Sequence, residues 1–155
     1  LTVTDLDIQQ IDVWLHESLF PGRSRPALLP AHINGLLKGF IDLVFTEQGR
    51  YFLADYKFNS LGADAQAYQP QALEAAMLAK RYDVQLALYA LALHRLLKQR
   101  LGQEYDYDRD FGGCLYLFLR GVNSEGQGRL FIKPPQLLIA TLDQAFGGGS
   151  SHGGE

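Results

Sequence analysis

Apolar residues recur at helical spacing in three parts of the chain. Residues 4–19 carry them in a loose helical pattern, which predicts a first helix. Residues 70–101 begin with a proline and are rich in strong helix formers, so they predict one long helix, or two helices broken near residues 82–83. A proline pair opens a last helix, which we expect over residues 134–146.

Shorter runs in which apolar and polar residues alternate are typical of strands. Residues 38–45 and 50–58 flank the glycine-bearing connection 46–49 and predict a β-hairpin, and further strands are expected at 114–120 and 130–133. Because a helical stretch separates the second strand from the third, these two should be parallel, with the first strand added antiparallel. The pattern therefore predicts an α/β fold, a small mixed β-sheet flanked by helices.

Length and composition narrow the class of protein. The 155 residues suffice for a single domain, expected over residues 1–146, with the glycine-rich residues 147–155 as a flexible tail. Hydrophobic residues make up 47% of the chain and charged residues 20%, an ordinary globular composition. A net charge of −3 excludes a basic protein that coats nucleic acid through charge alone.

The single cysteine and the short apolar runs exclude further classes. Cys114 alone cannot build a disulfide framework, a four-cysteine zinc site or an iron–sulfur cluster, and this cysteine usage suits a reducing cytoplasm. Charges or glycines interrupt every apolar run well before the ~18 residues of a membrane span, so no membrane partner is expected.

Strand alternation separates the charges of the hairpin from most of its apolar residues. With Phe45 opposite Arg50, one face is wholly apolar or aromatic and is the expected core face: Ile41, Leu43, Phe45, Phe52, Ala54, Tyr56 and Phe58. The other face carries the three ionisable groups of the strand interiors among apolar neighbours: Phe40, Asp42, Val44, Tyr51, Leu53, Asp55 and Lys57. The charges are therefore expected to be half buried.

The two aspartates of this face are candidate metal ligands. In the expected register, Asp42 and Asp55 are diagonal neighbours with backbones roughly 7–8 Å apart, so their carboxylates can close on one divalent cation. Oxygen ligands favour Mg²⁺ or Mn²⁺, and such an ion could polarise a phosphoryl oxygen and activate a water. Lys57 would orient or deprotonate that water, or stabilise charge on the phosphate. The alternative is a solvent-facing strand with an Asp–Lys pair worth under about 1 kcal/mol.

Several runs resemble one nuclease family. Gly39-Phe40-Ile41-Asp42, Asp55-Tyr56-Lys57 and the helical pair Gln85 and Tyr89 resemble the PD-(D/E)xK nucleases of the RecB type. The runs 37–45, 91–95 and 111–122 are similar to the C-terminal nuclease domain of that type. The resemblance implies a restriction-endonuclease-like core.

The family's site residues map onto this sequence. By resemblance, Asp42, Asp55 and the backbone carbonyl of Tyr56 would bind the metal, expected to be Mg²⁺ with Mn²⁺ or Ca²⁺ as substitutes in binding. Asp42, Asp55 and Lys57 would be catalytic, and Gln85 and Tyr89 would shape the site.

The resemblance also implies a substrate and partners. The expected activity is that of an exodeoxyribonuclease V type enzyme, which hydrolyses single-stranded DNA within a helicase–nuclease complex during double-strand break repair and recombination. RecC-like and RecD-like subunits would be the protein partners. The alternative is a catalytically inactive nuclease-like module that binds DNA or partner subunits.

Two features depart from, or add to, the family pattern. A histidine ligand lies upstream of the first aspartate in the family, and the chain is expected to be a C-terminal fragment that begins after it; His16, Glu17 and His32 are the nearby candidates for a substitute. A set of basic residues in the helical region could form a DNA-phosphate footprint or a merely solvated face: Lys80, Arg81, Arg95, Lys98 and Arg100.

Overall fold

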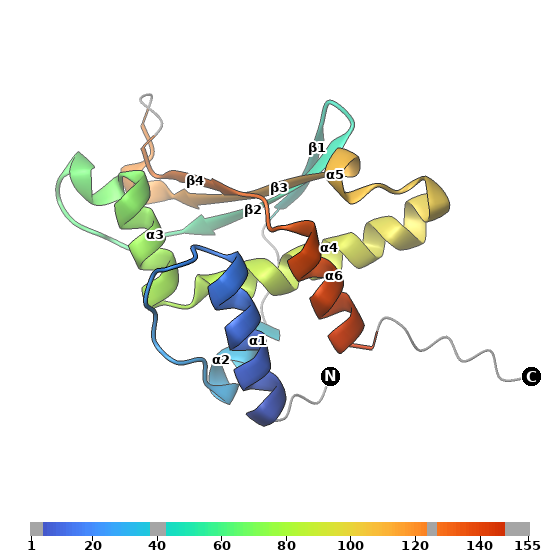
Figure 1. Cartoon of the computed structure of the whole chain (residues 1–155). Helices are drawn as coiled ribbons and strands as arrows, with labels where there is room; N and C mark the ends of the chain where they lie inside the picture. The colour runs from blue at the N-terminus through green and yellow to red at the C-terminus, as the bar shows by residue number, and fades with distance from the viewer. Residues whose placement is uncertain (1–4, 38–42, 124–126, 148–155) are drawn as a thin grey trace, which may run out of the picture.

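The fold is built on a four-stranded mixed sheet with strand order β1-β2-β3-β4 (Figure 1). The computed structural model describes residues 5–37, 43–123 and 127–147. Its strands are β1 (Leu43–Glu47), β2 (Arg50–Lys57), β3 (Phe111–Phe118) and β4 (Arg129–Ile132). β1 is antiparallel to β2, β2 is parallel to β3, and β3 is antiparallel to β4, which confirms the predicted mixed sheet.

The helices gather on one side of this sheet, below it in Figure 1. They are α1 (Asp5–Ser18), α2 (Pro30–Leu37), α3 (Pro70–Ala79), α4 (Tyr82–Leu101), α5 (Tyr107–Asp110) and α6 (Gln136–Ala145), with short 3₁₀ turns at Ala65–Tyr68, Gly102–Glu104 and Leu119–Gly121. The predicted break in the long helical region is confirmed between α3 and α4. The short helix α2 was not predicted. No described helix is long and apolar enough to cross a membrane.

The register of the hairpin differs from the predicted one by two residues. Glu47 pairs with Arg50 and Phe45 with Phe52, so the connection has two residues, not four. Both connecting residues have positive φ, +51° at Gln48 and +76° at Gly49. Two-residue turns of this kind match the right-handed twist of the flanking strands, which therefore pair right up to the turn.

The predicted core face of the hairpin is wrong. Leu53, on the face that also carries Asp55, is buried in the core, whereas Leu43 is 41% exposed and Phe45 stacks on Phe52 on the opposite face. A register shift of two residues leaves each side chain on its own face, so the shift is not the cause. Both faces are rich in apolar residues, and the position of the helices decides which one is covered. The predictions for residues 38–42 lie outside the described residues.

Strand β3 begins three residues earlier than predicted, because two glycines lie inside it. A side chain at Gly112 would collide with the ring of Phe52, and one at Gly113 would collide with the ring of Phe131. The pairing of β2 with β3 also shifts by one residue at this point. The glycines therefore accommodate aromatic rings within the sheet and do not precede the strand.

The core lies between the sheet and the helices, with α4 packed across the middle. Its buried residues include Leu86, Ala87, Ala90, Leu93 and Leu97 of α4, Ile8, Ile11 and Leu15 of α1, Leu138, Ile139 and Leu142 of α6, and Cys114, Tyr116 and Phe118 of β3. Helix α4 thus faces the side of the sheet that carries Asp55.

Candidate active site

A carboxylate and an ammonium meet on the helix-covered face of the central strand β2. Asp55 is 7% exposed, and its Oδ2 lies 2.8 Å from Nζ of Lys57. The two residues are two positions apart, so alternation along the strand places both side chains on one face. Only 12% of the Lys57 side chain is exposed. Ionised groups lose much of their hydration at such a depth, which makes the pair a candidate functional site.

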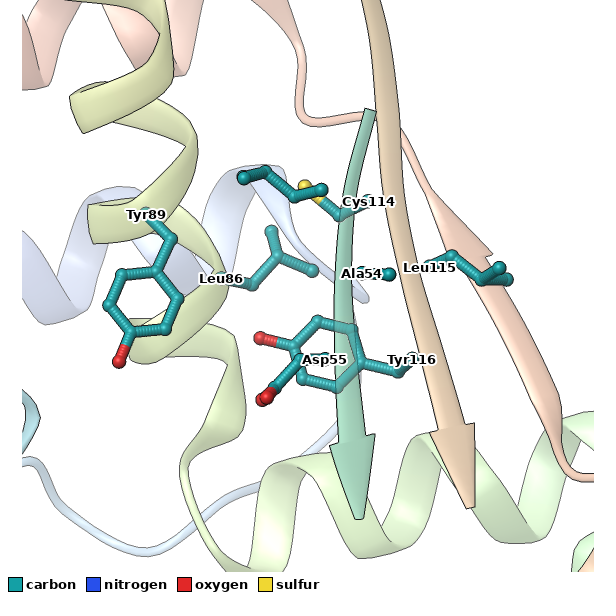
Figure 2. Close-up of a pocket in the computed structure, with 8 residues that line it drawn as sticks. Ala54, Asp55, Leu86, Tyr89, Cys114, Leu115 and Tyr116 are labelled. Carbon is teal, nitrogen blue, oxygen red and sulfur yellow. The ribbon is translucent and has the colours of Figure 1, made fainter. Parts of the chain in front are cut away.

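A tyrosine from β3 and a glutamine from α4 adjoin this pair. Tyr116 pairs with Asp55 across the parallel ladder, and its hydroxyl donates to Oε1 of Gln85 at 3.2 Å. Burial raises the pKa of Tyr116 well above its ordinary value, so its hydroxyl remains a hydrogen-bond donor. Figure 2 shows Asp55 and Tyr116 projecting side by side toward α4, which contributes Tyr89 and Leu86 to the same narrow pocket.

Lys57 also contacts an aromatic ring that sequence reasoning missed. Its Nζ lies 3.9 Å from the ring centroid of Tyr82, the first residue of α4, and 5.8 Å from that of Tyr116. The Tyr82 hydroxyl is within hydrogen-bonding distance of the Asn59 amide, 3.3 Å from Nδ2. In the sequence, Tyr82 stands at the predicted helix break. This position predicts that Tyr82 begins a helix, but it does not predict the contact with Lys57.

The structure brings together four of the predicted site residues. Asp55 and Lys57 on β2 face Gln85 and Tyr89 on α4, whereas Asp42 lies outside the described residues. In sequence, Asp42 directly precedes Leu43, the last described partner in the β1–β2 ladder, and Leu43 pairs with Ala54.

The described residues contain no group of three His, Cys, Asp or Glu side chains that could hold a metal. His16 lies 3.6 Å from Asp12 on its own helix. His32 accepts a hydrogen bond from the backbone of Leu29, at 2.9 Å. Glu17 is exposed on α1. The structure therefore gives no support to these three residues as substitutes for the upstream histidine.

The donor set at Asp55 nevertheless has the chemistry of a hard-cation site. The Asp55 carboxylate and the backbone carbonyl of Tyr56 are both oxygen ligands, the kind that Mg²⁺ and Mn²⁺ prefer. Cys114 is buried, and burial raises the pKa of its thiol to about 12. These residues fit part of a divalent-metal site.

The structure removes Arg81 from the predicted basic footprint. Arg81 is 1% exposed, and its guanidinium is held by Asp83 and Asp12, so it cannot reach a phosphate. Arg95 and Lys98 both contact the carboxylate of Asp143, at 2.6 and 3.2 Å. Lys80 and Arg100 are exposed.

Arg81 belongs to a buried ionic cluster, which we define as Asp12, Arg25, Arg81 and Asp83. Arg25 and Asp83 lie 3.0 Å apart with side chains fully buried, and Arg81 lies 3.0 Å from Asp83 and 2.7 Å from Asp12. Burial alone would raise the pKa of Asp12, but the hydrogen bond and charge of Arg81 outweigh burial and lower this pKa. The cluster has two charges of each sign, which balance.

Comparison with known proteins identifies relatives of this chain. Residues 9–146 match the sequence profile of the PD-(D/E)XK nuclease superfamily. The chain is 54% identical over 125 residues to the RecBCD enzyme subunit RecB of Escherichia coli, covering 79% of this chain and 10% of that protein. It is 50% identical over 115 residues to the RecB of Haemophilus influenzae, covering 74% and 9%. It therefore spans about a tenth of the length of these relatives.

Proposed function

This chain belongs to the PD-(D/E)XK nuclease superfamily, and from that premise we propose that it is a metal-dependent deoxyribonuclease domain. The observation that carries the proposal is the buried pair of Asp55 and Lys57 on the helix-covered face of β2. Burying an ionised carboxylate beside an ionised ammonium costs both groups hydration. The presence of such a pair at this depth therefore indicates a use in chemistry.

We assign metal binding to oxygen ligands on β2 and to Asp42, which comes directly before β1 in the sequence. Asp42, Asp55 and the backbone carbonyl of Tyr56 would hold a divalent cation, with Mg²⁺ proposed. When bound, the cation supplies Lewis acidity at the phosphate and lowers the pKa of a bound water.

The remaining chemistry comes from the chain's own side chains. Lys57 holds its ammonium beside the Asp55 carboxylate, where it can donate a hydrogen bond to a phosphate oxygen or to the attacking water. Gln85 fixes the hydroxyl of Tyr116 and Tyr89 lines the same pocket, so α4 restricts the space in which a phosphodiester can lie.

The proposed substrate is single-stranded DNA. The relatives are named as subunits of a RecBCD enzyme, so we propose that this domain works beside a DNA helicase, with RecC-like and RecD-like partners, in double-strand break repair and recombination.

A cleavage assay with matched variants tests the proposal. The purified chain is incubated with an end-labelled single-stranded DNA oligonucleotide in the presence of Mg²⁺, of Ca²⁺, or of EDTA. Asp55→Asn and Lys57→Ala should each lower cleavage by at least about 10³-fold, because each removes a group that contacts reacting atoms. Asp108, which is exposed, and Lys133, whose Nζ contacts the backbone carbonyl of Asp108, provide the matched controls, Asp108→Asn and Lys133→Ala, which should cleave like the parent.

Duplex DNA and an RNA of the same sequence test the substrate preference. Slower cleavage of both is expected. Equal cleavage by Lys57→Ala and the parent would overturn the assignment of the site. DNA binding without cleavage under any metal would identify an inactive binding module instead.

A further inference from the structure

We infer that Tyr82 positions the Lys57 ammonium for cleavage, a role that rests on the proposed function. Nζ of Lys57 lies 3.9 Å from the centre of the Tyr82 ring and 2.8 Å from Oδ2 of Asp55. The ammonium is therefore held between an aromatic face and a carboxylate. An aromatic face attracts a cation electrostatically, and more strongly where water is largely excluded, as around this 12% exposed side chain.

The ring is itself held at both ends. At its outer end, the Tyr82 hydroxyl lies 3.3 Å from Nδ2 of Asn59, which is two residues beyond Lys57 in the chain. At its backbone end, Tyr82 is the first residue of α4. The ring thus bridges the start of the helix and the end of the catalytic strand.

The residue before Tyr82 fixes where α4 starts. Arg81 has a φ of +54°, in the left-handed region that residues with side chains seldom adopt. Its guanidinium donates to Asp83 and Asp12, and also to the backbone carbonyl of Pro26 at 2.7 Å. The buried ionic cluster thereby fixes the direction in which α4 leaves the break, and with it the place of the Tyr82 ring.

Without the Tyr82 ring, the Lys57 ammonium would still be attracted to Asp55, but it would lose the aromatic contact on its other side. The ammonium could then collapse onto the carboxylate or swing toward solvent. An error of about 1 Å in a catalytic group can lower a rate by about 10²-fold. Tyr82 is thus a positioning residue that acts through Lys57.

Two substitutions separate the ring from its hydroxyl. Tyr82→Leu removes the aromatic face at similar bulk, and should lower kcat for single-stranded DNA by about 10- to 100-fold with little change in KM. Tyr82→Phe keeps the face and should stay within about threefold of the parent. Tyr105, half-buried at the far end of α4, provides the control: Tyr105→Leu should lose stability but keep kcat.

A magnetic resonance measurement reports on the same contact whether or not the chain cleaves DNA. The ring current of Tyr82 should shift the ε-methylene protons of Lys57 upfield from those of the exposed Lys80 in the parent and in Tyr82→Phe. The shift should vanish in Tyr82→Leu. Normal Lys57 resonances in the parent would overturn the inference, as would a Tyr82→Leu chain that cleaves like the parent while Lys57→Ala does not. If the parent shows the shifted Lys57 resonances but does not cleave DNA, the proposed function is overturned, while the contact between Lys57 and Tyr82 is supported.

Discussion

Two buried ionic groups lie near the start of α4, and within the described residues they differ in the kind of partner that their cations contact. In the buried ionic cluster, Arg81 donates to two carboxylates and a backbone carbonyl, and Arg25 donates to Asp83 and three backbone carbonyls. At the candidate site, Lys57 faces one carboxylate and aromatic rings. The first set of contacts holds two guanidiniums between distant segments, whereas the second holds an ammonium beside the carboxylate that we propose as a metal ligand.

The buried ionic cluster has the contacts of charges that serve the fold, whereas we propose that the Asp55–Lys57 pair serves chemistry. The buried ionic cluster ties α1 and the segment after it to the start of α4, through contacts that span 55 to 69 residues of sequence. The Asp55–Lys57 pair lies within one strand, so this ion pair itself joins no segments that are distant in sequence. Loss of the cluster should therefore unfold the protein, and loss of the pair should stop its chemistry.

The largest effect on stability is expected from Asp83→Asn. Arg25 and Arg81 would lose the carboxylate that they share, so the free energy of unfolding should fall by about 3–5 kcal/mol in chemical denaturation. The control is Glu74→Gln, because Glu74 pairs with Arg23 where both side chains are about a third exposed; its effect should stay under about 1 kcal/mol. Similar losses in the two variants would refute the structural role of the cluster.

A change in stability of intermediate size, which depends on pH, is expected from His94 in the second half of α4. Burial lowers the pKa of His94 from its ordinary 6.5, an effect that nearby Asp143 opposes and that Lys98 and Arg95 reinforce. The unfolded chain therefore takes up the proton first as the pH falls, and the folded state loses stability from about pH 6.5 down to the folded-state pKa.

This loss should not exceed about 1.4 kcal/mol per pH unit, the limit for one proton. Denaturation at several pH values measures it, and His94→Gln should flatten the curve between pH 7 and 5. A variant whose curve matches the parent's would show that another group is responsible.

A smaller change in stability is expected at the candidate site. Asp55→Asn should lower the free energy of unfolding by about 1–2 kcal/mol, because Lys57 would lose one carboxylate partner, whereas Asp83→Asn removes a carboxylate from two guanidiniums. The same variant should have lost its cleavage activity. A loss as large as that of Asp83→Asn would place the pair among the structural charges and erase the contrast between the two regions.

The smallest effect is expected from Lys98→Gln. Half of the Lys98 side chain is exposed, and Arg95 also binds its partner Asp143, so the free energy of unfolding should fall by a few tenths of a kcal/mol. Thermal unfolding beside the control Lys80→Gln measures the difference. A drop above about 1 kcal/mol would show that surface pairs of this chain contribute more than expected.

Local rules predicted α1, α3, α4, α6 and the mixed sheet, but not the short helices α2 and α5, nor which hairpin face is covered. Pro70 and the helix-forming composition predicted α3 and α4, and the helical connection predicted that β2 and β3 are parallel. Alternation correctly placed Asp55 and Lys57 on one face of the hairpin. It could not identify the covered face, because Leu53 and Phe52 are equally plausible core residues until the helices are placed.

The candidate site was predictable only where its residues are close in sequence. Asp55 and Lys57 share a face because they are two residues apart, and Gln85 and Tyr89 share one because they are four apart. The contacts of Tyr116 and Tyr82 depend on how α4 packs over the sheet, which local patterns do not encode. Arg81 was misjudged for the same reason, since its partner Asp12 lies 69 residues away.

Calorimetric titration of the chain with Mg²⁺ tests the central claim most directly. The parent should bind the ion, and Asp42→Asn and Asp55→Asn should each weaken binding at least about tenfold, because each removes a carboxylate ligand. The control Asp108→Asn should bind like the parent, and the fold of each variant is verified by circular dichroism. A parent that binds no Mg²⁺, or an Asp55→Asn variant that binds it equally well, would contradict the account.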